Sequence, residues 1–364
     1  MLKKIDKRIL LLLIIFSAIS VVTIYLSESL LVEVNNYYIK QIIWYVIGFI
    51  LIFFILKIGN KNIYKYAWAF YIISNILLFL LLFLAAPINE AKCWFTIKGI
   101  GTIQPSEFAK IALIILLAKE CDSFKEKHPN PSIKDEFKFL IKIVLILIPP
   151  SFLTFLEPDT GVVLIYFIIT IVMLFILGIR YRWFVFLGLS CIIILSIILS
   201  IYFLKQELFI SIFGNSFFLR INRLLDWSNK TGYQLEKSLT SIGSAGLFGH
   251  GFNIKLYIPE PQTDFIFAIY SSAFGLFGSF VLLSLICLFD LKLINLGIKT
   301  KKNVDRYILS GIIGMLIYQQ FQNIGMTYGL VPITGITLPF ISYGGSSLLS
   351  YMIIMGLVLN ISKD

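Results

Sequence analysis

The chain has 364 residues, of which 58% are hydrophobic and only 14% are Asp, Glu, Lys or Arg. A soluble domain usually carries about 25% of these charged residues, so this composition excludes a soluble globule. The formal net charge of +11 would suit nucleic-acid binding in a soluble protein, but membrane proteins gather Lys and Arg in their cytoplasmic loops. We therefore expect an all-α, polytopic integral membrane protein with no nucleic-acid partner.

Apolar runs long enough to cross a bilayer, about 18 residues or more, recur along the whole chain. They predict ten transmembrane helices, at approximately 9–26, 40–57, 66–86, 104–119, 138–156, 160–179, 183–204, 264–290, 307–326 and 338–360. No internal repeat of fixed period is visible. We expect a single transmembrane domain over residues 1–364.

Basic residues gather in alternate loops between the predicted spans. These loops follow spans two, four, six and eight, and their basic residues include Lys57, Lys61, Lys65, Lys119, Lys125, Lys127, Arg180, Arg182, Lys292, Lys299 and Arg306. The positive-inside rule places these loops, and both termini with them, in the cytoplasm. The one long connection, residues 205–263, then lies outside the cell, and loops this long are usually functional.

Cysteine and histidine are sparse in this sequence. Cys93, Cys121, Cys191 and Cys287 are far apart and form no CxxC pair. Only two histidines are present. The sequence therefore predicts neither a disulfide framework nor a His-based metal site.

Two oppositely charged residues lie near the start of the fourth span. Glu107 and Lys110 are three residues apart, so they share one face of a helix and can pair. Pro105 suits the first helical turn, where its missing N–H costs nothing. Charges inside a span mark function by default. The alternative is a solvated helix start at the outer surface.

An acidic turn, Glu157-Pro158-Asp159, joins the fifth and sixth spans. Such residues are typical of an exposed turn. The alternative is that Asp159 points inward and joins Glu107 and Lys110 in a buried charge network, because an isolated buried lysine is costly.

Asp264 stands where the long external loop meets the apolar eighth span. A carboxylate in this position is partly desolvated, which raises its pKa and suits a general base. Thr263 or Asp264 could also cap the helix. The two roles are compatible.

The stretch at 332–347 is a poor helix start, because it combines Pro332 and Pro339 with the glycine pair Gly344-Gly345 and several serines. Irregular backbone at membrane depth is tolerated where it lines protein or a cavity. The alternative interpretation is a face of small residues that packs closely against a neighbouring helix.

Five sequence strings occur in order along the chain. They are QPSEFAK at 104–110, EPDTG at 157–161, GYQ at 232–234 with IGSAG at 242–246, IPEPQTDFIFA at 258–268, and NIGM…PITG…LPFISYGGSS at 323–347. Together they resemble the SEDS (shape, elongation, division and sporulation) family of peptidoglycan glycosyltransferases, with the elongation branch, RodA, slightly favoured over the division branch, FtsW.

The resemblance implies an enzyme that polymerises lipid II at the outer face of the cytoplasmic membrane, in an elongation or division complex with a class B penicillin-binding protein as its transpeptidase. The family's proposed catalytic aspartate falls on Asp264, and its intramembrane network falls on Glu107, Lys110 and Asp159. The expected substrate-binding residues are Lys92, Trp94, Lys98, Arg220, Gln234, Lys237, Glu260, Ser342 and Ser346. A divalent cation, Mg²⁺ or Mn²⁺, would suit the pyrophosphate oxygens.

Two other functions remain open from the sequence. A lipid II flippase would need a polar path across the membrane, to which Glu107, Lys110 and Asp159 could contribute. A non-enzymatic scaffold for a partner transpeptidase would tolerate the loss of every charged residue named above. An external catalytic aspartate favours the glycosyltransferase over both.

Overall fold

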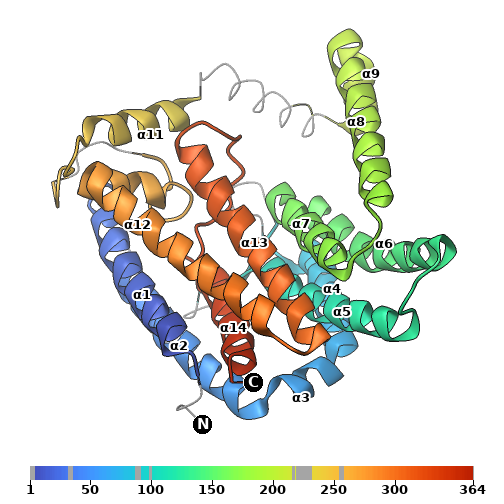
Figure 1. The fold of residues 1–364 in the computed structure, drawn as a ribbon. Coiled ribbons are helices and arrows are strands. Elements are labelled where there is room, and N and C mark those ends of the chain that lie inside the picture. The colour runs from blue at the N-terminus through green and yellow to red at the C-terminus, as the bar shows by residue number, and fades with distance from the viewer. Residues whose placement is uncertain are drawn as a thin grey trace.

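A computed structural model describes residues 5–31, 36–86, 92–97, 101–214, 218, 232–253 and 258–363. The described chain is a bundle of helices with one small β-hairpin (Figure 1). The helices are α1 (Lys7–Glu28), α2 (Tyr37–Ile58), α3 (Asn60–Lys65), α4 (Ala67–Leu84), α5 (Pro105–Lys127), α6 (Ile133–Leu156), α7 (Thr160–Leu177), α8 (Tyr181–Leu204), α9 (Gln206–Phe213), α11 (Tyr233–Ser244), α12 (Ile266–Lys299), α13 (Asn303–Thr327) and α14 (Gly345–Ile361). Strands β1 (Phe95–Ile97) and β2 (Gly101–Ile103) pair antiparallel, with Phe95 opposite Ile103.

Each predicted span corresponds to a helix, namely α1, α2, α4 to α8 and α12 to α14. Within the described residues, seven of these helices are long and apolar enough to cross a membrane, and α14 is apolar but shorter, with 17 residues. Helices α5 and α13 are more polar because they lie inside the bundle. Helix α5 packs against α4, α7 and α13, and α13 packs against α7, α12 and α5. A helix surrounded by other helices needs no lipid-facing surface, which explains why these two can be more polar. The seven apolar helices make the fold that of a multi-pass membrane protein.

Four of the predicted span limits are wrong by five residues or more. Helix α5 continues to Lys127 instead of residue 119, and α6 begins at Ile133 instead of residue 138. Helix α12 continues to Lys299, so Lys292 and Lys299 lie on the helix and not in the loop that follows it. Helix α14 begins at Gly345 instead of residue 338, because the preceding stretch is irregular. Within that stretch Gly335 and Phe340 adopt positive φ values of 71° and 64°.

Helices α2 and α14 approach so closely that glycine is required between them. A Cβ on Gly356 would lie 2.9 Å from Cβ of Ile55, and a Cβ on Gly48 would lie 2.6 Å from Cγ of Met352. Within the predicted packing face at 332–347, the same close approach to α2 occurs at Gly345, where an added Cβ would lie 2.7 Å from Cε2 of Trp44. The irregular backbone and the close packing occur together.

Helix α8 stands apart from the bundle, and α8 and α9 project away from it in Figure 1. Tyr202 is its only buried residue. The start of α8 is fixed, because the Trp183 indole N–H donates to the Glu136 carboxylate of α6 at 2.8 Å. The two chain ends lie together, since the Asp6 N–H donates to the Ser362 hydroxyl at 3.2 Å.

Replacing Gly356 with Val tests the close approach of α2 and α14. The added side chain would collide with Ile55, a β-branched residue with little rotamer freedom, and overpacking of this kind costs about 1–3 kcal/mol. We expect a lower melting temperature for the purified protein in detergent. The matched control is Gly188→Val on α8, where nothing lies within 4 Å of the added Cβ. Equal melting temperatures for the two variants would contradict the packing.

Candidate active site

Asp264 lies in a tight turn that precedes α12. The backbone N–H groups of Thr263 and Phe265 both donate to the Glu260 carbonyl, at 3.3 and 3.4 Å. Glu260 adopts a positive φ of 50°, which closes the turn. The N-cap of α12 is Phe265, and no side chain makes a capping hydrogen bond there. The capping alternative is therefore wrong, and the partly buried carboxylate of Asp264 is available for another role.

Asn323 of α13 fixes the backbone of this turn. Its side-chain amide donates to the Asp264 carbonyl at 2.9 Å and to the Ile336 carbonyl at 2.8 Å. One side chain thus joins the Asp264 turn to the irregular segment 329–344. Asn323 lies in a string that supported the family resemblance, but the sequence gave no reason to assign it this role.

The irregular segment itself makes two further contacts with the turn. The Ser342 hydroxyl donates to the Thr263 carbonyl at 2.6 Å and accepts from the Leu338 N–H at 2.9 Å. The Tyr343 N–H donates to the Gln262 carbonyl at 2.9 Å. Ser342 was predicted to bind substrate, but in this structure its hydroxyl holds the backbone that carries Asp264.

The surroundings of Asp264 give its carboxylate the properties of a base. The pKa of Asp264 is raised to about 7, mainly by burial and also by the negative charge of Glu260, while a hydrogen bond from Thr263 lowers it. The charge of Asp159 adds a smaller upward effect on this pKa. A carboxylate with a pKa near the working pH is well suited to accept a proton.

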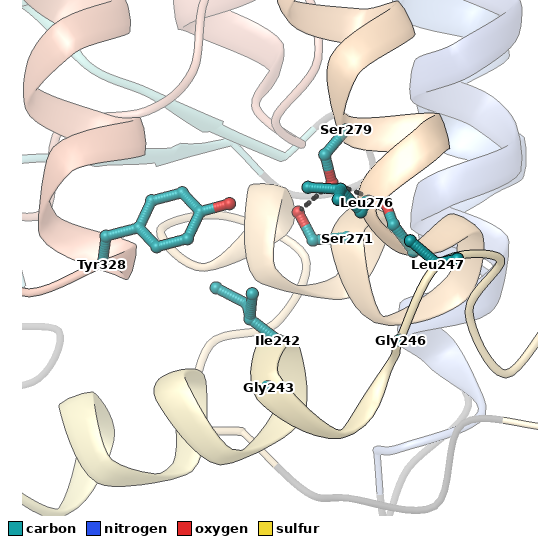
Figure 2. A pocket seen from close by; sticks show the side chains of 9 residues that line it. Ile242, Gly243, Gly246, Leu247, Ser271, Leu276, Ser279 and Tyr328 are labelled. Atoms are coloured by element: carbon teal, nitrogen blue, oxygen red, sulfur yellow. Dashed lines mark hydrogen bonds between the residues drawn. The ribbon is translucent and has the colours of Figure 1, made fainter.

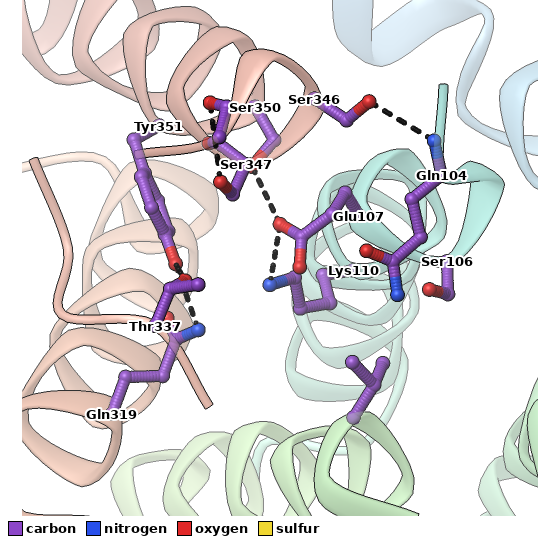
Figure 3. Close-up of polar contacts among 12 residues, drawn as sticks. Gln104, Ser106, Glu107, Lys110, Gln319, Thr337, Ser346, Ser347, Ser350 and Tyr351 are labelled. Carbon is purple, nitrogen blue, oxygen red and sulfur yellow. Dashed lines mark hydrogen bonds and ion pairs between the residues drawn. The ribbon is translucent and has the colours of Figure 1, made fainter. Parts of the chain in front are cut away.

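A buried ion pair lies in the middle of the bundle, as Figure 3 shows. Lys110 Nζ lies 2.7 Å from Glu107 Oε2, and the lysine side chain is fully buried. The Ser350 hydroxyl of α14 donates to the same oxygen at 3.1 Å. The ammonium also lies 5.5 Å from the ring centroid of Tyr351. The pair expected from the spacing of these residues is present, and the solvated helix start is wrong.

Asp159 joins this neighbourhood without an ion pair to Lys110. One carboxylate oxygen accepts from the Gln104 side-chain amide at 2.7 Å, and the other caps α7 by accepting from the Val162 N–H at 3.1 Å. Burial raises the pKa of Asp159 to about 6; Glu107 raises it as well, and Lys110 lowers it. Asp159 therefore links the ion pair to Asp264 through electrostatics and not through a direct contact.

Glu157 was expected in an exposed turn, but the structure places it in the interior. It is fully buried, and neither carboxylate oxygen has a hydrogen-bond partner. Burial and the charge of Asp159 raise the pKa of Glu157 to about 9, so the group is neutral at pH 7. The Cys93 thiol donates to the Glu157 carbonyl at 2.7 Å. For Glu157, the exposed-turn interpretation is wrong.

Of the substrate-binding candidates on the first outer loop, the structure describes Lys92 and Trp94. Lys92 is exposed and Trp94 is partly buried, just before β1. The Ser346 hydroxyl of α14 accepts from the Gln104 N–H at 3.0 Å and donates to the Thr102 carbonyl at 3.2 Å, so it ties this loop to the bundle. Lys98 lies outside the described residues.

On the long external connection, Gln234 and Lys237 lie on α11 and are partly buried. Lys237 Nζ lies 5.4 Å from the ring centroid of Tyr233. Helix α11 is seated on the bundle, because the Ser238 hydroxyl donates to the Thr327 carbonyl of α13 at 2.8 Å. Glu260 is exposed beside Asp264. Arg220 lies outside the described residues.

The predicted Mg²⁺ or Mn²⁺ finds no ready-made site in the described part of the chain. No group of three or more His, Cys, Asp or Glu there could hold a metal ion.

Comparisons with known proteins agree with this architecture. The family model for FtsW, RodA and SpoVE, described as "Cell cycle protein", matches residues 4–364. The chain therefore belongs to this family, the SEDS family of membrane proteins. It is 34% identical to stage V sporulation protein E of Bacillus subtilis over 339 residues, which cover 89% of this chain and 86% of that protein. It is 32% identical to the probable peptidoglycan glycosyltransferase FtsW of Lactococcus lactis over 302 residues, 77% of this chain and 71% of that protein.

Solved structures show the same fold. A chain from a peptidoglycan synthase complex that coordinates polymerization and crosslinking superimposes with a TM-score of 0.80 and 27% identity, covering 99% of this chain and 98% of that one. The rod shape determining protein RodA of Thermus thermophilus superimposes with a TM-score of 0.72 and 26% identity, covering 99% of this chain and 97% of that one. The helical membrane fold expected from the sequence is confirmed.

Removing the charge of Lys110 tests the buried pair. Lys110→Met leaves the Glu107 carboxylate buried without a counter-charge, which costs roughly 3–5 kcal/mol. We expect a large fall in melting temperature, most of which the double variant Glu107→Gln/Lys110→Met restores. The control is Lys125→Met, because Lys125 is exposed on the last turn of the same helix and exposed substitutions of this kind change stability by about 0.5 kcal/mol or less. A stable Lys110→Met single variant would refute the charge pairing.

Proposed function

We propose that the chain is a peptidoglycan glycosyltransferase that polymerises lipid II at the outer face of the cytoplasmic membrane. Relatives named as probable peptidoglycan glycosyltransferases support the reaction class. The observation that carries the proposal is the Asp264 turn, which holds a partly buried carboxylate of raised pKa at the end of the long connection between α8 and α12. The sugar headgroups of a membrane-anchored substrate lie at the membrane surface, where the end of this connection lies in the proposed orientation.

The chemistry follows from this carboxylate. The acceptor sugar hydroxyl gives its proton to Asp264 while its oxygen attacks the anomeric carbon of the donor. The bond from that carbon to the pyrophosphate oxygen breaks, and undecaprenyl pyrophosphate leaves. The departing negative charge requires positive charge nearby, for which Lys92, Lys98, Arg220 and Lys237 are the candidates. Trp94, Gln234 and Glu260 would contact the sugars.

A transpeptidase partner of the class B penicillin-binding type completes the proposal. Its support is the structural neighbour from a complex that coordinates polymerization with crosslinking. The relatives include division, sporulation and rod-shape proteins. The proposal therefore covers lipid II polymerisation and leaves the choice between elongation and division open.

The membrane orientation is tested with a reporter fused after Asn229. Ten crossings and the basic loops predict both termini in the cytoplasm and residues 205–263 outside, so this reporter reads extracytoplasmic. A fusion after His128, between α5 and α6, is the matched control and reads cytoplasmic. The opposite result for either fusion would overturn the orientation.

Asp264→Asn tests the catalytic assignment. The substitution keeps the size of the side chain but removes the base, and general-base catalysis contributes about 10²–10⁴-fold. We expect glycan-strand synthesis from lipid II, with the cognate transpeptidase present, to fall by about that factor while the melting temperature is retained. The wild-type rate should fall as the pH drops below about 7, because protonation removes the base.

The same assay separates the other functions. Near-normal polymerisation by Asp264→Asn would show that Asp264 is not the base. It would then favour the two alternative functions, a lipid II flippase or a scaffold. Lys142→Met serves as the control variant, because Lys142 lies on α6 in a pair with Glu120 that is remote from this chemistry.

A further inference from the structure

Helix α12 is broken at Gly275, whose φ of 67° and ψ of −162° are not helical. In a continuous helix the Leu276 N–H would donate to the Ser272 carbonyl and the Phe277 N–H to the Ala273 carbonyl. The break leaves these four backbone groups without their helical partners. At membrane depth such groups require a partner inside the protein.

The loop 246–251 supplies all four partners. The Leu276 and Phe277 N–H groups donate to the carbonyls of Gly246 and Leu247, both at 3.0 Å. In the other direction, the N–H groups of residues 250 and 251 donate to the Ser272 and Ala273 carbonyls, both at 2.9 Å. The external connection therefore replaces two helical hydrogen bonds with four of its own, and it is inserted into α12 as a structural part of that helix.

Two glycines make this insertion sterically feasible. A Cβ on Gly249 would lie 2.2 Å from the Ala273 carbonyl oxygen, and a Cβ on Gly275 would lie 2.4 Å from the Gly249 nitrogen. Both collisions are with backbone atoms, which cannot move aside as a flexible side chain can. Both glycines also adopt positive φ, 77° and 67°. We call this backbone contact between Gly249 and Gly275 the glycine junction.

Figure 2 shows the surroundings of the junction. The Ser279 hydroxyl donates to the Gly275 carbonyl at 2.8 Å and lies within hydrogen-bond distance of the Ser271 hydroxyl, at 2.9 Å, so it bridges the break along α12. A cavity of about 330 Å³ lies between α11, α12 and the end of α13. The loop thus contacts α12 directly at the break, with open space beside it.

The part of α12 before the break is the support of Asp264. Residues 266–274 form a short helical rod that runs from the Asp264 turn to the junction. We propose that the glycine junction positions Asp264, so that Gly249 and Gly275 are positioning residues for the glycosyl transfer. The inference rests on the proposed function. It assigns the 246–251 loop a mechanical role, because movement of the external connection is transmitted through the junction to the catalytic turn.

The decisive comparison is Gly249→Ala against Gly246→Ala. Both glycines lie on the same loop and have positive φ, 77° and 59°, but only Gly249 has backbone atoms within reach of the added Cβ. A 1 Å misplacement of a catalytic group can cost about 10²-fold in rate. We expect Gly249→Ala to lower kcat for lipid II polymerisation by about that factor with KM retained, and Gly246→Ala to lower it far less.

Hydrogen exchange of the purified full-length variants separates this inference from the proposed function, because it needs no activity. Gly249→Ala should speed amide exchange at the junction, in residues 272–277, and also in the Asp264 turn, in residues 260–266. If the wild type makes no glycan strands, the proposed function fails while this exchange result still stands. Unchanged exchange in the Asp264 turn, or equal kcat losses in the two alanine variants, would overturn the positioning role.

Ser279→Ala covers the case in which Gly249→Ala does not fold. It removes the hydroxyl that bridges the break without adding an atom to the junction. We expect a smaller fall in kcat, again with KM retained, and faster exchange in the Asp264 turn. A Ser279→Ala variant with normal kcat and normal exchange would contradict the inference.

Discussion

Backbone groups that leave a helix at membrane depth must find partners inside the protein, and the site depends on how this chain meets that requirement. The Asp264 turn and the segment 329–344 are both irregular, and groups of the segment donate hydrogen bonds to backbone carbonyls of the turn. Asn323 donates to carbonyls of both, and Ser342 closes the second segment while it donates to the first. The backbone that carries the Asp264 carboxylate is therefore held by the polar side chains of Asn323 and Ser342.

The same requirement explains why the long external connection is part of the bundle. At the break in α12 its loop supplies the hydrogen bonds that the helix has lost. A proline or a serine could have kinked the helix with fewer constraints. A break completed by a distant loop instead joins the two segments, so that the loop 246–251 and the helix that follows Asp264 form one unit.

Sequence patterns predicted the elements of this fold and the residues with charges, but not the contacts between distant segments. The apolar runs located the ten helices that correspond to the predicted spans, including α5 and α13, although these two are too polar to pass as spans by composition. The spacing of Glu107 and Lys110 predicted their pair, because both lie on one helix. By contrast, Asn323 is 59 residues from Asp264, and Gly249 meets Gly275 only after a loop has been inserted into a helix. Periodicity carries no information on such encounters.

Several acidic residues lie around the site, and the structure reduces their combined negative charge. A donor with a pyrophosphate would be repelled by Glu107, Glu157, Asp159 and Asp264 if all four were charged. Glu107 is balanced by Lys110, with Nζ and Oε2 2.7 Å apart. Burial raises the pKa of Glu157 to about 9, so it carries a proton at pH 7. Asp159, Asp264 and the exposed Glu260 then remain to carry negative charge, and the pKa of Asp264, about 7, leaves Asp264 only partly ionised at pH 7. In the proposed reaction, an anionic donor would therefore approach a base that is only partly charged, and the proton that Asp264 accepts would remove its remaining charge as the pyrophosphate departs.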